Sequence, residues 1–151
     1  RLLTQVATLD DAAYRRDVGL FFNSIHGTLN HLLVTEHLLW FKRFADGESP
    51  KLALNAEAET DRERLAQRLT EGAARWLPFI ESLPASRFAE TLTYTTTRGT
   101  TVTLHLSPTL GHVFNHGTHH RGQISAALTA MGQAAPELDW VYLLLEEAGP
   151  T

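Results

Sequence analysis

Four of the chain's eight histidines lie within the nine positions from His112 to His120. The residues around them are typical of one long helix. Ser107 can cap its N-terminus, Pro108 suits the first helical position, and Gly132 suits a left-handed C-terminal cap. A histidine-rich helix of about six turns is therefore the element around which the rest of the 151-residue chain must fold.

His116 and His120 are the best placed of these histidines to bind one cation. Relative to His116, His120 lies about 40° to one side, toward an apolar stripe centred about 90° away. His112 and His119 lie on the other side, about 40° and 60° from His116. The apolar stripe consists of Leu110, Val113, Ile124, Leu128 and Met131. Because side chains one turn apart stack on one face, the imidazoles of His116 and His120 can converge.

A third ligand must come from elsewhere, because zinc sites usually have at least three protein ligands. The candidate is His31, in the apolar segment LNHLLVTEHLLWFKRF. The residues that share its half of a helix are Leu32, Thr35, Leu38 and Leu39. His37 lies about 240° around the same helix, so the two cannot face one ion. We therefore predict that His31 joins the histidine pair.

Each of these histidines also has a simpler interpretation, as a packing or hydrogen-bonded residue at the edge of the core. His112 and His119 are expected to line a pocket or to support the ligands, since a ligand histidine usually donates its second N–H to a neighbour. Arg121 is expected to form a salt bridge that anchors its helix, and Gln123 can orient a water or a ligand imidazole. The remaining histidines are interpreted as surface or packing residues: His26, His37 and His105.

Two segments of the sequence resemble the DinB/YfiT-like superfamily. They are NSIHGTLNHLLVTEHLLWFKRF and HVFNHGTHHRGQI, and the resemblance extends over nearly the whole chain, including the closing PELDWVYLLLEE. It implies a metal-binding four-helix bundle. One ligand histidine would come from the second helix and two, spaced HxxxH, from the last long helix. These positions are His31, His116 and His120 here, in agreement with the helical-face argument.

The rest of the pattern predicts an all-α fold, a four-helix bundle with a β-hairpin crossover between helices 3 and 4, in one domain over residues 1–151. The chain begins at Arg1 and is expected to lack the start of helix 1. The expected helices cover residues 1–8, 24–44, 60–83 and 107–131, with Pro78 kinking or ending the third. Residues 91–96 and 101–106 alternate with period two, as hairpin strands do. A short helix over residues 136–145 is expected to cover one end of the bundle.

Composition removes several classes of function. The 13 basic and 17 acidic residues give a net charge of −4 without a basic cluster, which argues against nucleic-acid binding. The chain has no cysteine, so any thiol chemistry must use the sulfur of a substrate. No apolar run approaches about 18 residues, so we expect a cytoplasmic protein without a membrane segment.

Three neutral imidazoles would leave a divalent ion at least one open position, as in catalytic zinc sites. Imidazole suits several transition metals, of which zinc and nickel are expected here. Neither HExxH nor GxSxG is present, which argues against zinc proteases and serine hydrolases. The resemblance implies a metal-dependent transferase or hydrolase acting on a small molecule, with a low-molecular-weight thiol as the partner of an S-transferase. The alternative is a non-catalytic metal-binding stress-response or interaction protein.

We also expect a homodimer. His112, His119, Trp40 and the several apolar sides of the second helix offer more exposed apolar surface than one bundle core should use, and two-fold dimers are the commonest oligomers. The resemblance points the same way. The competing interpretation is that the closing helix and the hairpin cover this surface and leave a monomer.

Overall fold

The computed structural model describes residues 1–149 of the chain. The described part is mostly helical and carries one two-stranded antiparallel sheet. Its helices are α1 Leu2–Val6, α2 Asp11–Arg15, α3 Ile25–Leu32, η1 Leu33–Trp40, α4 Phe41–Ala45, α5 Arg62–Ala74, α6 Trp76–Ser82, η2 Ala85–Ala89, α7 Leu106–Ala130 and α8 Trp140–Ala148. The strands are β1 Thr91–Thr95 and β2 Thr101–His105. The prediction of a helical chain with one hairpin before the histidine helix is confirmed.

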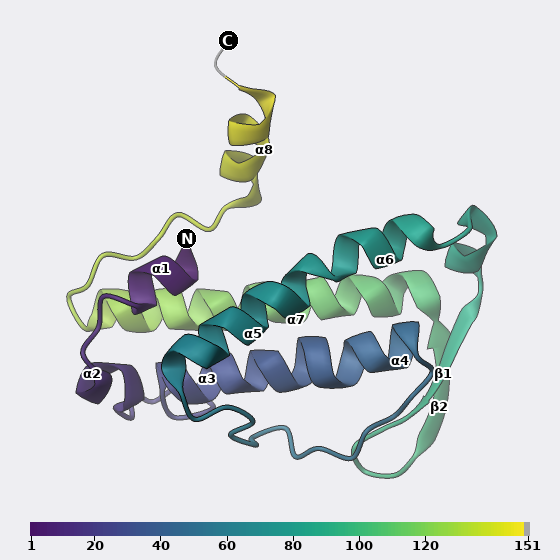
Figure 1. The fold of residues 1–151 in the computed structure, drawn as a ribbon, viewed down its shortest axis with the longest axis horizontal. Helices are drawn as coiled ribbons and strands as arrows, with labels where there is room; N and C mark the ends of the chain where they lie inside the picture. The colour runs from purple at the N-terminus through teal and green to yellow at the C-terminus, as the bar shows by residue number, and fades with distance from the viewer. Residues whose placement is uncertain (150–151) are drawn as a thin grey trace.

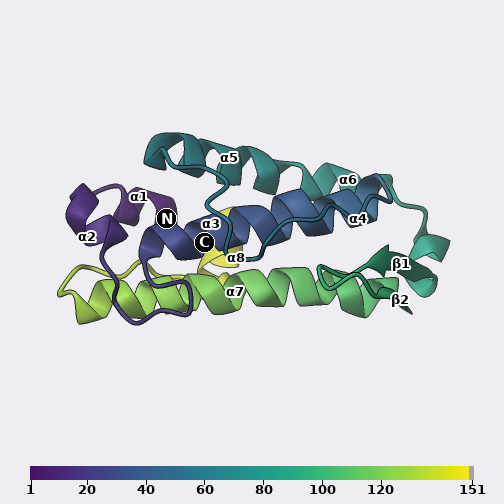
Figure 2. The same ribbon diagram turned by 90° about the horizontal axis from the view of Figure 1, so that it is seen from below.

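The continuous helix α3–η1–α4 lies between α5–α6 on one side and α7 on the other (Figure 2). Ser24 begins it as predicted, because its Oγ accepts a hydrogen bond from the Gly27 N–H at 3.0 Å. The middle segment, η1, is a π-helix, which the sequence did not reveal. It begins at Leu33, two residues after His31, and π-helical turns occur frequently at functional sites.

The predicted third helix is broken at Arg75 into α5 and α6. Pro78 explains the break, because it has no N–H to donate to the carbonyl of Ala74 and its ring would collide with that carbonyl. Asp61 caps the beginning, since its Oδ1 accepts from the Arg64 N–H at 2.8 Å. The expected kink is therefore confirmed.

The hairpin leads directly into α7 and lies at the end of the molecule where α4 ends (Figure 1). Its register pairs Leu92 with Leu104. The helix begins two residues earlier than predicted, at Leu106 instead of Pro108, and the prediction that Ser107 caps it is wrong. The Ser107 hydroxyl instead donates to the carbonyl of Phe88. At the other end Gly132 has φ 71°, which confirms the left-handed cap.

The prediction that the closing helix covers one end of the bundle is wrong. α8 projects away from the other helices (Figure 1), and none of its residues is buried. The reason lies in α1, which already covers that end of α7. Its Leu2 and Val6 belong to the same core cluster as Ile124 and Leu128. No helix in the described part of the chain is long and apolar enough to cross a membrane.

Two apolar clusters form the core, and the histidine-rich turns of α7 lie between them. One cluster includes Ile124 and Leu128 in the second half of α7. The other is rich in aromatic residues and includes Leu110 and Val113 in the first half. The intervening turns therefore face neither cluster fully, which leaves room there for a polar site.

Two helical glycines provide a matched test of this packing. A Cβ at Gly27 would collide with the carbonyl oxygen of Phe22, whereas one at Gly111 would have no heavy atom within 4 Å. We expect Gly27→Ala to lower the free energy of unfolding by about 1–3 kcal/mol. Gly111→Ala should raise it by about 0.5–1 kcal/mol, because alanine loses less backbone entropy in a helix. Urea unfolding of both variants checks this, and equal shifts in one direction would contradict it.

Candidate metal centre

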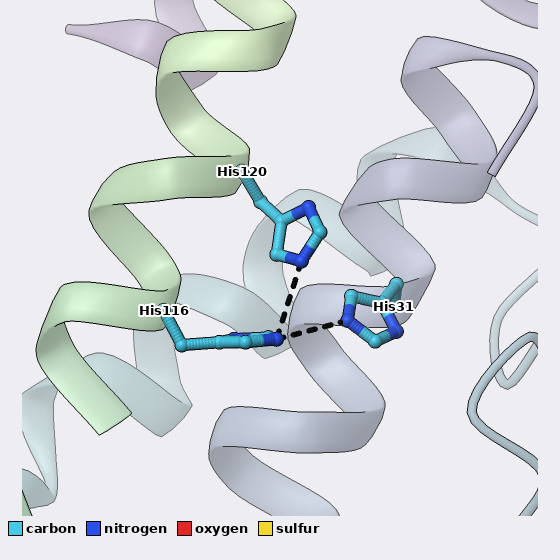
Figure 3. A group of neighbouring side chains, drawn as sticks. All are labelled: His31, His116 and His120. Atoms are coloured by element: carbon cyan, nitrogen blue, oxygen red, sulfur yellow. Dashed lines mark hydrogen bonds between the residues drawn. The ribbon is translucent and has the colours of Figure 1, made fainter. Parts of the chain in front are cut away.

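Three histidine side chains from two helices point toward one another (Figure 3). His31 comes from α3, and His116 and His120 come from successive turns of α7. The Nε2 atom of His116 lies 3.2 Å from Nε2 of His31 and 3.2 Å from Nε2 of His120. One nitrogen of each residue lies within 4.8 Å of the other two. The structure thus brings together the three residues predicted from the sequence.

Hydrogen bonds on the far side of two rings fix which nitrogen carries the proton. His31 Nδ1 lies 2.7 Å from the backbone carbonyl oxygen of Leu54, which can only accept, so Nδ1 carries the hydrogen. His120 Nδ1 lies 2.8 Å from Oε1 of Gln123, which also accepts. Gln123 thus orients the His120 imidazole, as one of the two predicted roles requires. Both rings therefore turn an Nε2 lone pair toward the centre.

This arrangement fits a cation better than it fits a hydrogen-bonded cluster. His116 Nε2 can donate at most one hydrogen, so it can satisfy only one of its two 3.2 Å neighbours. The other contact then places two lone pairs opposite each other. Tetrahedral zinc with Zn–N bonds of about 2.0–2.1 Å holds its nitrogens about 3.3 Å apart. The three imidazoles could therefore bind a divalent ion with little rearrangement.

The environment keeps these rings neutral, which is the form that binds metal. Burial lowers the pKa of His31 to about 4. Burial, followed by the neighbouring histidines, lowers the pKa of His116 to about 4. The pKa of His120 is also lowered, chiefly by burial. At neutral pH no proton needs to leave these three rings before an ion binds.

The metal-free protein should consequently lose stability as the pH falls from 6.5 toward 4. Burial also lowers the pKa of His37 to about 4. A histidine whose folded pKa lies below its ordinary 6.5 takes up its proton in the unfolded chain first, so acid favours unfolding. Glu36 opposes this because burial raises its pKa to about 7, but the lowered histidines outnumber it. Denaturation midpoints of chelator-treated protein at several pH values check the sign. A midpoint that stays level or rises on acidification would contradict it.

The other histidines discussed above lie outside the cluster of three. The His112 ring lies 5.6 Å from the Trp40 ring and lines a cavity beside the centre, as predicted. His119 is exposed, with its ring 4.9 Å from that of His120. His26 and His37 are buried packing residues. None of these four belongs to the cluster of three.

Arg121 forms the predicted salt bridge that anchors its helix. Its Nη1 lies 3.5 Å from Oε1 of Glu36 on η1, so the pair links α7 to the central helix. Gly117 permits this contact, because a Cβ there would collide with the Glu36 carboxylate.

Two contributions to the centre were missed from the sequence. The ring of Phe22 stacks on His31 with 3.8 Å between centroids and 18° between planes. The carbonyl of Leu54 orients the same histidine from the connection between α4 and α5. Both come from loops, where no periodicity indicates direction, and a backbone carbonyl leaves no trace in residue type.

A cavity of about 230 Å³ lies directly beside the centre. His31 and His116 form part of its wall, together with Trp40 and Tyr94. A larger cavity of about 580 Å³ has Phe22 in its wall but none of the three clustered histidines. The smaller cavity is therefore the one that gives a small molecule access to the histidines.

A mostly helical chain in which one histidine of a central helix meets an HxxxH pair on the last long helix defines a class of possible metal-binding proteins. The chain belongs to the DinB family, whose model matches residues 1–148. Protein DinB of Bacillus subtilis (strain 168) is 26% identical to it over 155 residues, which cover 96% of this chain and 87% of that protein. No solved structure gives a significant match.

Proposed function

We propose that this protein is a divalent-metal-dependent enzyme that acts on a small molecule. The observation that carries the proposal is the position of the three converging Nε2 atoms beside the cavity of about 230 Å³. Three imidazoles leave a divalent ion at least one position for water or substrate. A closed structural site would need a fourth protein ligand, and the cluster found among residues 1–149 contains three.

The ion, zinc or nickel in our proposal, would supply Lewis acidity that lowers the pKa of a coordinated water or thiol. The chain's own residues position the ligands. Leu54 and Gln123 fix the orientations of His31 and His120, and Phe22 shields one face of His31. Since the chain has no cysteine, a thiol would come from a low-molecular-weight substrate. On the resemblance to the family, the particular enzyme that we propose is an S-transferase.

We infer the four-helix bundle of the DinB family, in one domain, with α1 in the place of the first helix. The other three helices would then be α3–η1–α4, α5–α6 and α7.

Thioether formation tests the enzymatic proposal. Zinc- or nickel-loaded protein is mixed with glutathione or N-acetylcysteine and an aryl chloride, and release of chloride with formation of the thioether is followed over time. We expect a rate above the protein-free blank that His116→Ala lacks. Full metal occupancy without any rate for a broad set of thiols would favour the alternative, a non-catalytic metal-binding stress-response or interaction protein.

We also propose a homodimer, but through a different surface from the one that the sequence indicated. The apolar sides of the helix α3–η1–α4 are largely buried within the fold, whereas a continuous run of exposed apolar residues lies on α8. Exposed apolar patches commonly mark interaction sites. The exposed apolar residues of α8 include Trp140, which is 75% exposed, and Leu145, which is 60% exposed. Light scattering should give twice the 16.8 kDa of one chain, and Leu143→Glu with Leu145→Glu should halve that mass. A concentration-independent monomer in the unchanged protein would refute the dimer.

A further inference from the structure

Arg43 on α4 is a buried cation that has no carboxylate partner among residues 1–149. It is 5% exposed, and its guanidinium lies over the rings of Trp40 and Tyr94, at 4.6 and 4.5 Å from their centroids. Its Nη2 donates a weak hydrogen bond of 3.4 Å to the carbonyl of Thr95. Its Nε is buried and has no hydrogen-bond partner within residues 1–149. None of the ion pairs in that range involves Arg43.

Such a cation is unfavourable unless something binds to it. Burial lowers the pKa of the Arg43 guanidinium, but arginine remains charged in proteins. Stacking on two aromatic rings offsets part of the desolvation. It cannot satisfy the N–H groups, which point outward in the guanidinium plane. A buried unpaired charge with a free donor therefore needs an anion.

The cavity beside the histidine centre is the place where that anion can bind. Arg43 lines it together with His31 and His116, and no aspartate or glutamate does. The whole chain has a net charge of −4, so the positive charge of Arg43 in this wall contrasts with the acidic protein around it. Threonine hydroxyls of Thr35, Thr96 and Thr97 also line the cavity.

We propose that Arg43 binds the carboxylate of a small-molecule substrate whose reacting group lies at the histidine centre. The inference rests on the proposed function, and it adds the class of substrate. A planar carboxylate matches the guanidinium fork and can accept two of its hydrogen bonds.

The spacing of the cavity wall also limits the shape of this substrate. His31 and Arg43 are twelve residues apart on the continuous helix α3–η1–α4, a distance of roughly 18 Å along its axis. A carboxylate at Arg43 and a reacting atom at the histidines must therefore be several bonds apart. An elongated carboxylate-bearing thiol fits, whereas a compact one cannot reach both ends.

Matched pairs of thiols test the inference. Zinc-loaded protein is titrated with 6-mercaptohexanoate and with the neutral 6-mercaptohexanamide, and the series is repeated with the three-carbon pair. We expect the six-carbon acid to bind about tenfold to hundredfold more tightly than its amide, and the three-carbon acid to gain less. In Arg43→Met, which still packs against the two aromatic rings, the advantage should vanish while the amide binds as before.

A further titration distinguishes failure of the carboxylate site from failure of the proposed metalloenzyme. Chelator-treated protein is titrated with hexanoate, which has no thiol, and we expect binding that Arg43→Met loses. If no metal binds but this difference persists, the carboxylate site stands and the metalloenzyme fails. If metal binds but the acid and the amide bind the unchanged protein equally, the carboxylate site is refuted. If Arg43→Met does not fold, the acid and the amide are compared in the unchanged protein and in Arg43→Lys. Arg43→Lys should keep part of the preference for the acid, because lysine keeps the positive charge.

Discussion

Replacing His116 with alanine is expected to abolish stoichiometric binding of a divalent ion. Its Nε2 is the atom that lies 3.2 Å from both other nitrogens, so its loss leaves only two imidazoles, one fewer than zinc sites usually have. Loss of a residue that only supports a ligand typically costs 10–100-fold in metal affinity, so loss of a ligand should cost more than about 100-fold. Calorimetric titration of chelator-treated protein with zinc or nickel measures this.

His119→Ala is the matched control, because it makes the same substitution on the same helix. His119 is exposed and lies outside the cluster of three. It should leave both stoichiometry and affinity unchanged. One ion bound by His116→Ala at the affinity of the unchanged protein would show that the ligand assignment is wrong.

Removal of the metal is expected to destabilise the fold measurably. An ion that binds only the native state adds about 2.7 kcal/mol when its concentration is a hundred times Kd. In this fold it would join α3 to α7 between the two apolar clusters and relieve the facing lone pairs. For a domain of about this size each kcal/mol shifts Tm by about 2–4 °C.

Thermal unfolding with and without a chelator tests this second prediction. The Tm of the unchanged protein should fall when the ion is removed, whereas the Tm of His116→Ala should not respond. Complete removal of the ion from the unchanged protein with no change in Tm would contradict a stabilising site.

The candidate site could be predicted because most of it lies on regular helices. The 100° step per residue places His116 and His120 on one face whatever the helix packs against. His31 required more, namely an apolar neighbourhood and the resemblance to a family. Arg43 gave no signal, because its meaning depends on the tertiary packing of Trp40 and Tyr94 against its guanidinium.

The features that the sequence did not predict depend on tertiary contacts. The apolar residues of α8 indicated a helix, but not that α1 would already cover that end of α7. The π-helix after His31 changes hydrogen bonding without changing residue type. Ser107 is an acceptable cap by composition, yet its hydroxyl donates to Phe88 across the chain.

X-ray absorption at the metal edge tests most directly whether His31, His116 and His120 together bind one ion. Protein loaded with one equivalent of zinc should show three imidazole nitrogens at about 2.0–2.1 Å and at least one further light-atom ligand. His31→Ala should lose one of the three imidazoles. Fewer than three imidazoles in the unchanged protein, or a spectrum that His31→Ala leaves unaltered, would contradict a three-histidine centre.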